Sequence, residues 1–171
     1  MVDLVNTTSQ FIVWAQGTVE VMGYFGVFII SLVGSASIIL PIPAFIVVFA
    51  AGGFLNPWAV GIFAGLGSAI GELTGYGLGM GGRELLARKY GDLLIKTRNW
   101  VEKRGAFIII IVFALTPLPD DVIGILAGMI NYDIKKFFMA TLIGKIILNV
   151  AIALAGFYGM NWLFSVITLS G

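Results

Sequence analysis

Four ionisable side chains inside apolar segments are the candidates for chemistry in this sequence: Glu72, Asp120, Asp121 and Lys145. Placing such a group in a membrane costs about 2.5–3.5 kcal/mol even on the mildest scale, so such groups are functional candidates by default. We predict that these four line a substrate or ion pathway. Glu72 is the better candidate for carrying a proton, because a desolvated carboxyl group takes up a proton more readily. Glu20 is a weaker candidate of the same kind.

The two aspartates directly follow Pro119 and are expected in the first turn of a half-helix. Acidic side chains there satisfy free N–H groups and the helix dipole, so capping alone explains them as well as capping combined with transport. In the second case protonated carboxyls admit an anionic headgroup and ionised ones repel it. Lys145 is expected either to neutralise one of these carboxylates or to extend to the membrane interface.

Enzymatic chemistry has little support in the sequence. Cysteine and histidine are both absent, which excludes disulfides, thiolate catalysis, histidine metal sites and histidine bases. Neighbouring aspartates on a helix diverge by about 100°, so they do not face each other as a protease pair does. No phosphate-binding loop is present, and we expect no enzyme, cofactor or metal. A net charge of +1 argues against a nucleic-acid partner.

The composition predicts a multi-pass protein of the cell membrane. Of 171 residues, 59% are hydrophobic and 11% are charged, against about 25% charged residues in soluble domains. Residues 21–71 and 146–171 contain no charged side chain, whereas residues 83–104 hold seven of the ten Lys and Arg residues. Only Asp3 precedes the first apolar segment, so we expect no cleaved signal peptide.

A helix needs about 20 residues to cross the membrane, and this length sets the bounds of the predicted spans. The whole chain, 1–171, is predicted to form one membrane domain. Two apolar segments are broken near the middle by a Pro-x-Pro sequence, which ends a helix and favours a re-entrant hairpin. The positive-inside rule supports the second hairpin, because it keeps Lys135 and Lys136 on the side of segment 83–104. The predicted elements are transmembrane helices 10–33, 58–80 and 137–158, re-entrant hairpins 35–56 and 106–131, and an amphipathic cytoplasmic helix 82–104. The apolar tail 159–168 is too short to span alone.

The two broken segments resemble each other at an offset of 76 residues. Each contains the Pro-x-Pro, then seven residues, then Ala-Gly: Pro41-Ile-Pro43 to Ala51-Gly52, and Pro117-Leu-Pro119 to Ala127-Gly128. With one span between them, the copies have opposite orientations. This predicts an all-α fold built as an inverted repeat, with the four prolines at hairpin tips near the midplane, as in secondary transporters.

Glycines recur every fourth residue along segment 58–80, at Gly67, Gly71, Gly75 and Gly79. A helix face without side chains allows close approach of another backbone. We predict that this face packs against a hairpin or another span; a homodimer contact is the alternative.

These motifs resemble the DedA family, also called the SNARE-associated or VTT-domain family. The matching stretch runs from about Ser35 to Val150 and includes the two Pro-x-Pro segments, Gly67-Ser-Ala-Ile-Gly71-Glu-Leu-Thr-Gly75-Tyr76, Thr116-Pro-Leu-Pro-Asp-Asp and Gly144-Lys145. Within the family, the sequence resembles a small Pro-Leu-Pro-Asp-Asp subgroup. Arginines that flank the second hairpin in many members are absent here.

The resemblance implies two re-entrant hairpins and movement of lipids across the bilayer. The expected function is a transporter or flippase for a lipid or lipid-linked carrier, with polyprenyl-phosphate and phospholipid as candidate substrates and protons as the candidate coupling ion. The alternatives are an energy-independent scramblase or membrane-organising protein, and a small cation channel or exporter that uses the carboxylates.

Overall fold

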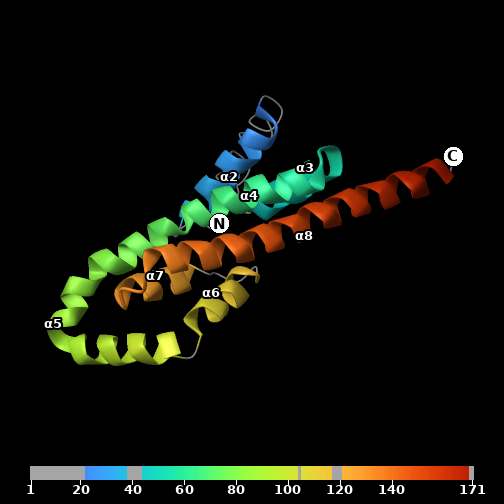
Figure 1. The fold of residues 1–171 in the computed structure, drawn as a ribbon. Helices are drawn as coiled ribbons and strands as arrows, with labels where there is room; N and C mark the ends of the chain where they lie inside the picture. The colour runs from blue at the N-terminus through green and yellow to red at the C-terminus, as the bar shows by residue number, and fades with distance from the viewer. Residues whose placement is uncertain (1–21, 38–43, 104, 117–120, 170–171) are drawn as a thin grey trace, which may run out of the picture.

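The computed structural model describes residues 22–37, 44–103, 105–116 and 121–169. All regular elements within these ranges are α-helices, which confirms the all-α class (Figure 1). The helices are α2 (Tyr24–Ala36), α3 (Ala44–Phe54), α4 (Pro57–Gly71), α5 (Leu73–Lys103), α6 (Ala106–Ala114), α7 (Asp121–Met129) and α8 (Ile134–Leu169).

Helices α4 and α5 form one rod that passes through Glu72. Asn56 starts it by accepting hydrogen bonds from the N–H groups of Trp58 and Ala59, at 3.0 and 3.2 Å, and proline fills the first helical position. At the junction the N–H of Glu72 donates to the Ser68 carbonyl, at 3.0 Å, so the helical bonding continues. The amphipathic helix predicted for 82–104 is therefore the continuation of this rod and not a separate element. Figure 1 shows α5 bending along its length.

The segments that the sequence predicts to be broken contain short helices. Helices α6 and α7 have nine residues each and fall within the predicted hairpin 106–131. The four prolines at the predicted tips lie outside the described residues. Residues 10–21 of the predicted helix 10–33 lie outside the described residues; in the remainder Gly23 has φ = 54°, and α2 begins after it. A glycine adopts this angle without strain, so it can interrupt a helix within a mostly apolar segment.

The long helix α8 is the centre of the packing. It lies against α3, α4 and α6, while α2 covers α4 and α7 covers α5 (Figure 1). It contains the predicted span 137–158, and the tail 159–168 continues it. Helices α4 and α8 run antiparallel, with Gly61 against Val150 and Gly65 against Ile146.

The glycines of the four-residue repeat lie at two different helix contacts. A β-carbon at Gly67 or Gly71 would collide with the backbone of α2, at Phe28 and Leu32 respectively. A β-carbon at Gly79 would collide with Ile125 of α7, and Gly75 lies beside Gly124 of the same helix. Missing side chains thus bring both a preceding and a following helix against the α4–α5 rod.

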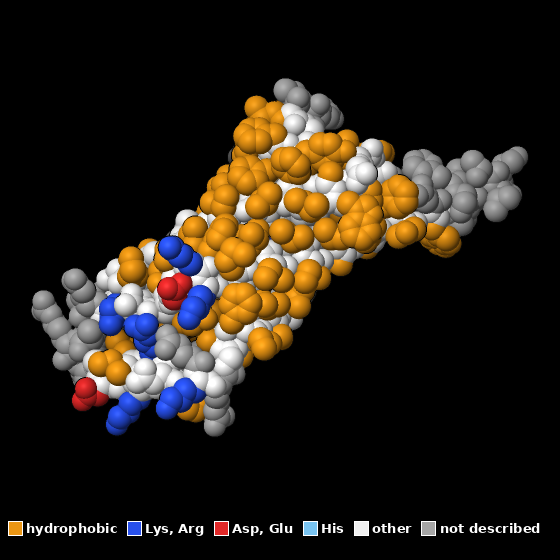
Figure 2. Space-filling model, in the orientation of Figure 1, with side chains coloured by type: hydrophobic (Ala, Val, Ile, Leu, Met, Phe, Trp, Pro, Cys, Tyr) orange, Lys and Arg blue, Asp and Glu red, His pale blue; other side chains and the backbone are white. Residues whose placement is uncertain are grey.

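The surface divides into an apolar body and a charged end. Figure 2 shows hydrophobic side chains over most of the visible face and Lys, Arg, Asp and Glu gathered where α5 and the start of α8 lie. Phe25, Trp58 and Ile108 are more than half exposed, as lipid-facing side chains are. In the described part of the chain one helical stretch, Ile134–Gly159, is by itself long and apolar enough to cross a membrane.

Asp133, at this charged end, caps α8. Its Oδ1 accepts a hydrogen bond of 2.9 Å from the N–H of Lys136. This bond is the main reason why the pKa of Asp133 lies below its usual value of 3.8; the Lys135 N–H and both lysine charges add to the effect. The cap therefore contributes stability that is present above pH 3.8 and is lost as the pH falls through the lower pKa of the folded state.

We expect Asp133→Ala to lower the melting temperature of the detergent-solubilised protein at pH 7. The difference from the unmodified protein should narrow when the melts are repeated below pH 3.8, where the carboxylate begins to take up its proton. Asp92→Ala, the same change at an exposed position of α5, is the control. A difference that is constant with pH would contradict a role for the ionised carboxylate.

Candidate functional site

Glu72 and Lys145 form a buried ion pair between the α4–α5 rod and α8. The Lys145 Nζ lies 3.0 Å from the Glu72 Oε1, and the two side chains are 9% and 3% exposed, respectively. The close contact of α4 and α8 at Gly61 and Gly65 brings the two helices near enough for this pair. In an apolar interior each charge stabilises the other, and loss of either one leaves the remaining charge at a high cost.

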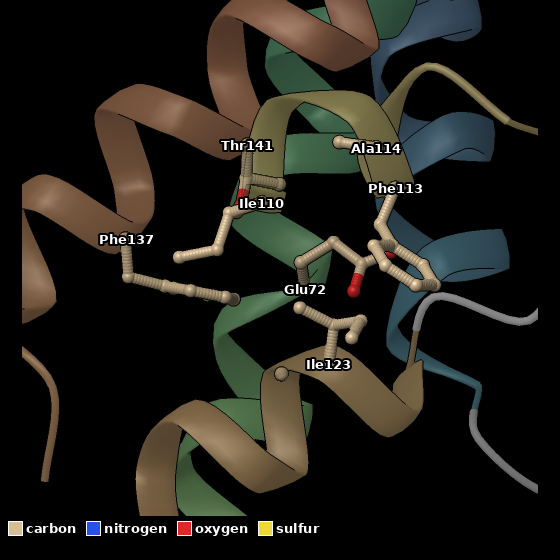
Figure 3. Close-up of a pocket in the computed structure, with 8 residues that line it drawn as sticks. Glu72, Ile110, Phe113, Ala114, Ile123, Phe137 and Thr141 are labelled. Atoms are coloured by element: carbon tan, nitrogen blue, oxygen red, sulfur yellow. The ribbon is translucent and has the colours of Figure 1, made fainter. Parts of the chain in front are cut away.

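The carboxylate of Glu72 faces a small cavity of about 10 Å³, which is at the lower limit for one water molecule. Figure 3 shows Glu72 pointing between side chains that come from three other helices. The wall consists of Ile110, Phe113 and Ala114 of α6, Ile123 and Gly124 of α7, and Phe137 and Thr141 of α8. Phe113 is itself 40% exposed, so one wall of the cavity is also part of the outer, lipid-facing surface.

Other buried polar side chains accompany the pair and were not predicted from the sequence. Thr141 and Asn149 lie one helical turn before and after Lys145, and Ser68 lies one turn before Glu72. The Asn149 Nδ2 donates to the Lys145 carbonyl, at 2.8 Å. The spacing of four residues in α8 was the available signal, but neutral polar residues occur too often in membrane helices to be singled out by it.

Tyr76 fixes the rod one turn beyond Glu72. Its hydroxyl donates a hydrogen bond to the Tyr132 carbonyl, which lies in the short link between α7 and α8. Its ring lies 5.2 Å from that of Phe137, which also lines the cavity. These contacts hold Glu72 in a fixed position relative to α7 and α8.

The predicted site residues have different outcomes. The structure brings Glu72 and Lys145 together as an ion pair. Lys145 is buried and does not extend to the surface. Asp120 and Glu20 lie outside the described residues. Asp121 begins α7 in the backbone, and its side chain belongs to the part that is not described.

Among the described side chains, the site holds one acid and one base in mostly apolar surroundings, with one wall at the outer surface. Within the described residues there is no group of three or more Asp, Glu, His or Cys side chains that could hold a metal. The groups present can exchange a proton, exchange charge partners, or pair with a charged ligand.

Comparison with known proteins places the chain in a family. Residues 42–158 match the VTT domain, which is more than half of the chain. Inner membrane protein YqaA of Escherichia coli (strain K12) is 28% identical over 110 residues, covering 64% of this chain and 74% of that protein. Transmembrane protein 41B of Xenopus tropicalis is 33% identical over 111 residues, covering 60% of this chain and 39% of that protein. No solved structure matches. The chain is therefore a membrane protein that belongs to the VTT-domain, or DedA, family.

Proposed function

We propose that this protein moves a lipid, or a lipid-linked carrier, between the two leaflets of the membrane, with Glu72 and Lys145 at its transport site. The observation that carries the proposal is the ion pair itself. Two opposite charges are buried where the α4–α5 rod, α6, α7 and α8 meet, in a membrane protein whose other buried side chains are mostly apolar. Such a pair costs too much in a membrane to be kept for packing alone.

A polar headgroup that crosses the bilayer needs a partner for its charge at mid-depth. The Glu72–Lys145 pair can bind a headgroup of either charge, because a phosphate can replace Glu72 at Lys145 and an ammonium can replace Lys145 at Glu72. The acyl chains need no protein enclosure, since they can stay in the bilayer. Phe113, half in the cavity wall and half on the outer surface, marks the side on which a headgroup would enter.

An inverted repeat is part of this proposal, and the helix contacts support it. The short helix of the first half, α3, packs on α8, with Gly52 against Ala153 and Phe49 against Gly156. In the second half, Gly128 of α7 packs against Tyr76 of α5, and Ile125 packs against Gly79. Adding 76 to the number of a residue in α3 gives its counterpart in α7. Adding 77 to the number of a residue in the α4–α5 rod gives its counterpart in α8. Each half thus places its short helix on the long helix of the other half, as two inverted copies would.

Re-entrant hairpins are part of the same proposal. Nine residues of α-helix are about 14 Å long, which is half of the bilayer core, so α6 and α7 together enter and return. This keeps Lys135 and Lys136 on the side of the basic second half of α5. The charged side chains gathered at one end of the molecule agree with such an arrangement (Figure 2).

Proton coupling follows from the pair if Glu72 must release Lys145 before an anionic headgroup can bind. A protonated Glu72 leaves the ammonium for a phosphate, and proton release restores the pair. Asp120 and Asp121, at the entrance to α7, are proposed to contribute to the same pathway. No covalent step is needed, so the proposed activity is transport and not catalysis.

The experiment is lipid flux in reconstituted vesicles, measured with fluorescent phospholipids with and without an imposed pH difference. We expect flux that depends on the pH difference, and about tenfold slower flux for both Glu72→Gln and Lys145→Met. Asp92→Asn and Lys136→Met make the same changes at exposed positions and should transport normally. Flux that is insensitive to pH would favour the scramblase, and flux of small cations without lipid movement would favour the channel.

A further inference from the structure

Four buried polar side chains occur as two matched pairs on the two central helices. Ser68 and Glu72 are one turn apart at the end of α4, and Lys145 and Asn149 are one turn apart in α8. All four are less than 10% exposed. The offset of 77 that relates the long helices takes Ser68 to Lys145 and Glu72 to Asn149. The offset therefore relates these two pairs of buried polar positions to each other, whereas the buried Thr141 corresponds to the apolar Ala64.

The antiparallel packing of α4 and α8 relates these two pairs of positions to each other. Because α4 and α8 run antiparallel, one turn back on α4 and one turn forward on α8 leads from the Glu72–Lys145 pair to Ser68 and Asn149. The same internal relation already accounts for Gly52 on Ala153 and Gly128 on Tyr76. The Glu72–Lys145 ion pair thus lies at one of two related positions between α8 and the α4–α5 rod. The neutral side chains of Ser68 and Asn149 lie at the other.

We propose that Ser68 and Asn149 form a second headgroup site, which takes the polar headgroup of the moving lipid when the path opens toward the opposite membrane face. The proposal rests on the lipid transport proposed above. Two inverted halves that exchange conformations turn the surroundings of one site into those of the other. A headgroup released from the Glu72–Lys145 pair is then bound by Ser68 and Asn149 at the related position.

The Ser68 and Asn149 side chains have the chemistry to bind a headgroup and to release it again. The serine hydroxyl donates and accepts, and the asparagine amide offers two hydrogens and an oxygen. The Asn149 amide donates one hydrogen bond to the Lys145 carbonyl. Neutral groups bind a phosphate or an ammonium by hydrogen bonds alone, so the headgroup leaves more easily than from a charged partner. Burying such groups is costly when they serve only packing.

The first test asks whether the two places are equivalent and needs no transport assay. The exchange variant carries Glu72→Asn, Asn149→Glu, Lys145→Ser and Ser68→Lys, which moves the ion pair to the second place. We expect its melting temperature in detergent to stay within about 4 °C of the unmodified protein. Ser68→Lys alone, which buries a lysine without its acid, should melt about 10 °C lower. An exchange variant as unstable as Ser68→Lys would overturn the equivalence and the proposal with it.

The second test measures phospholipid flux at equal amounts of folded, reconstituted protein. Ser68→Ala and Asn149→Ala should each slow flux about tenfold, the effect of one hydrogen bond lost to a charged headgroup. Thr97→Ala and Asn99→Ala are exposed controls on α5 and should have no effect. If Asn149→Ala does not fold, Ser68→Ala decides. Normal flux in the folded variants would overturn the second site. Absence of flux in the unmodified protein would instead refute the proposed function, while the exchange variant would still report on the equivalence.

Discussion

Replacing Lys145 with methionine is expected to lower the free energy of unfolding by about 3–5 kcal/mol, because it leaves the Glu72 carboxylate in an apolar interior without its counter-charge. Both side chains are more than nine-tenths buried, so little screening by solvent reduces the effect. Methionine keeps most of the length of lysine and packs in similar space, so the loss reports mainly on the charge. Thermal or denaturant unfolding in detergent at pH 7 measures it.

Two further variants separate the pair from other causes. The double variant Glu72→Gln/Lys145→Met removes both charges and should recover most of the lost stability, since a buried pair can often be replaced by neutral groups at little cost. Lys136→Met, an exposed lysine on the same helix, should change stability by less than about 0.5 kcal/mol. Equal effects of Lys145→Met and Lys136→Met would show that the pair does not hold the two helices together.

The sequence was sufficient for the class and for the identity of the two central charges. Charge-free segments and Pro-x-Pro breaks predicted an all-α membrane protein, and Glu72 and Lys145 stood out as ionisable groups in apolar helices. Their pairing could not be predicted, because it depends on how α4 and α8 cross. Gly61 and Gly65 set that crossing by allowing contact with Val150 and Ile146. Glycines without a known partner helix do not reveal which helix approaches them.

The differences in helix boundaries have a local origin. The chain passes Gly81 and Gly82 within α5, where a glycine lowers helix propensity by about 1 kcal/mol but does not end a helix that packs elsewhere. At Gly23 a positive φ separates α2 from the preceding residues. All three residues are glycines in apolar or mixed sequence, and only the backbone φ angle distinguishes Gly23 from Gly81 and Gly82. The buried polar residues Ser68 and Asn149 were missed because neutral polar residues in apolar segments have no distinctive signal in the sequence.

Substituting leucine for Gly71 is expected to destabilise the protein by about 1–3 kcal/mol through overpacking. A β-carbon at Gly71 would lie 2.6 Å from the Leu32 carbonyl oxygen and 2.9 Å from the Ala36 nitrogen. These are backbone atoms of α2, so no side-chain rotation can relieve the contact, and α2 must move away from the rod.

Gly77→Leu makes the same change further along the rod, where a β-carbon would meet nothing within 4 Å. There leucine should be neutral or stabilising by up to about 1 kcal/mol, because it gains helix propensity over glycine. The comparison is made by thermal unfolding and by size-exclusion chromatography in detergent. Since Gly71 precedes Glu72, displacement of α2 should also disturb the ion pair, and Gly71→Leu should slow lipid flux where Gly77→Leu does not. If both variants are equally stable, α2 does not pack on the Gly67–Gly71 face in the membrane, and the close helix contact that positions Glu72 is not formed as described.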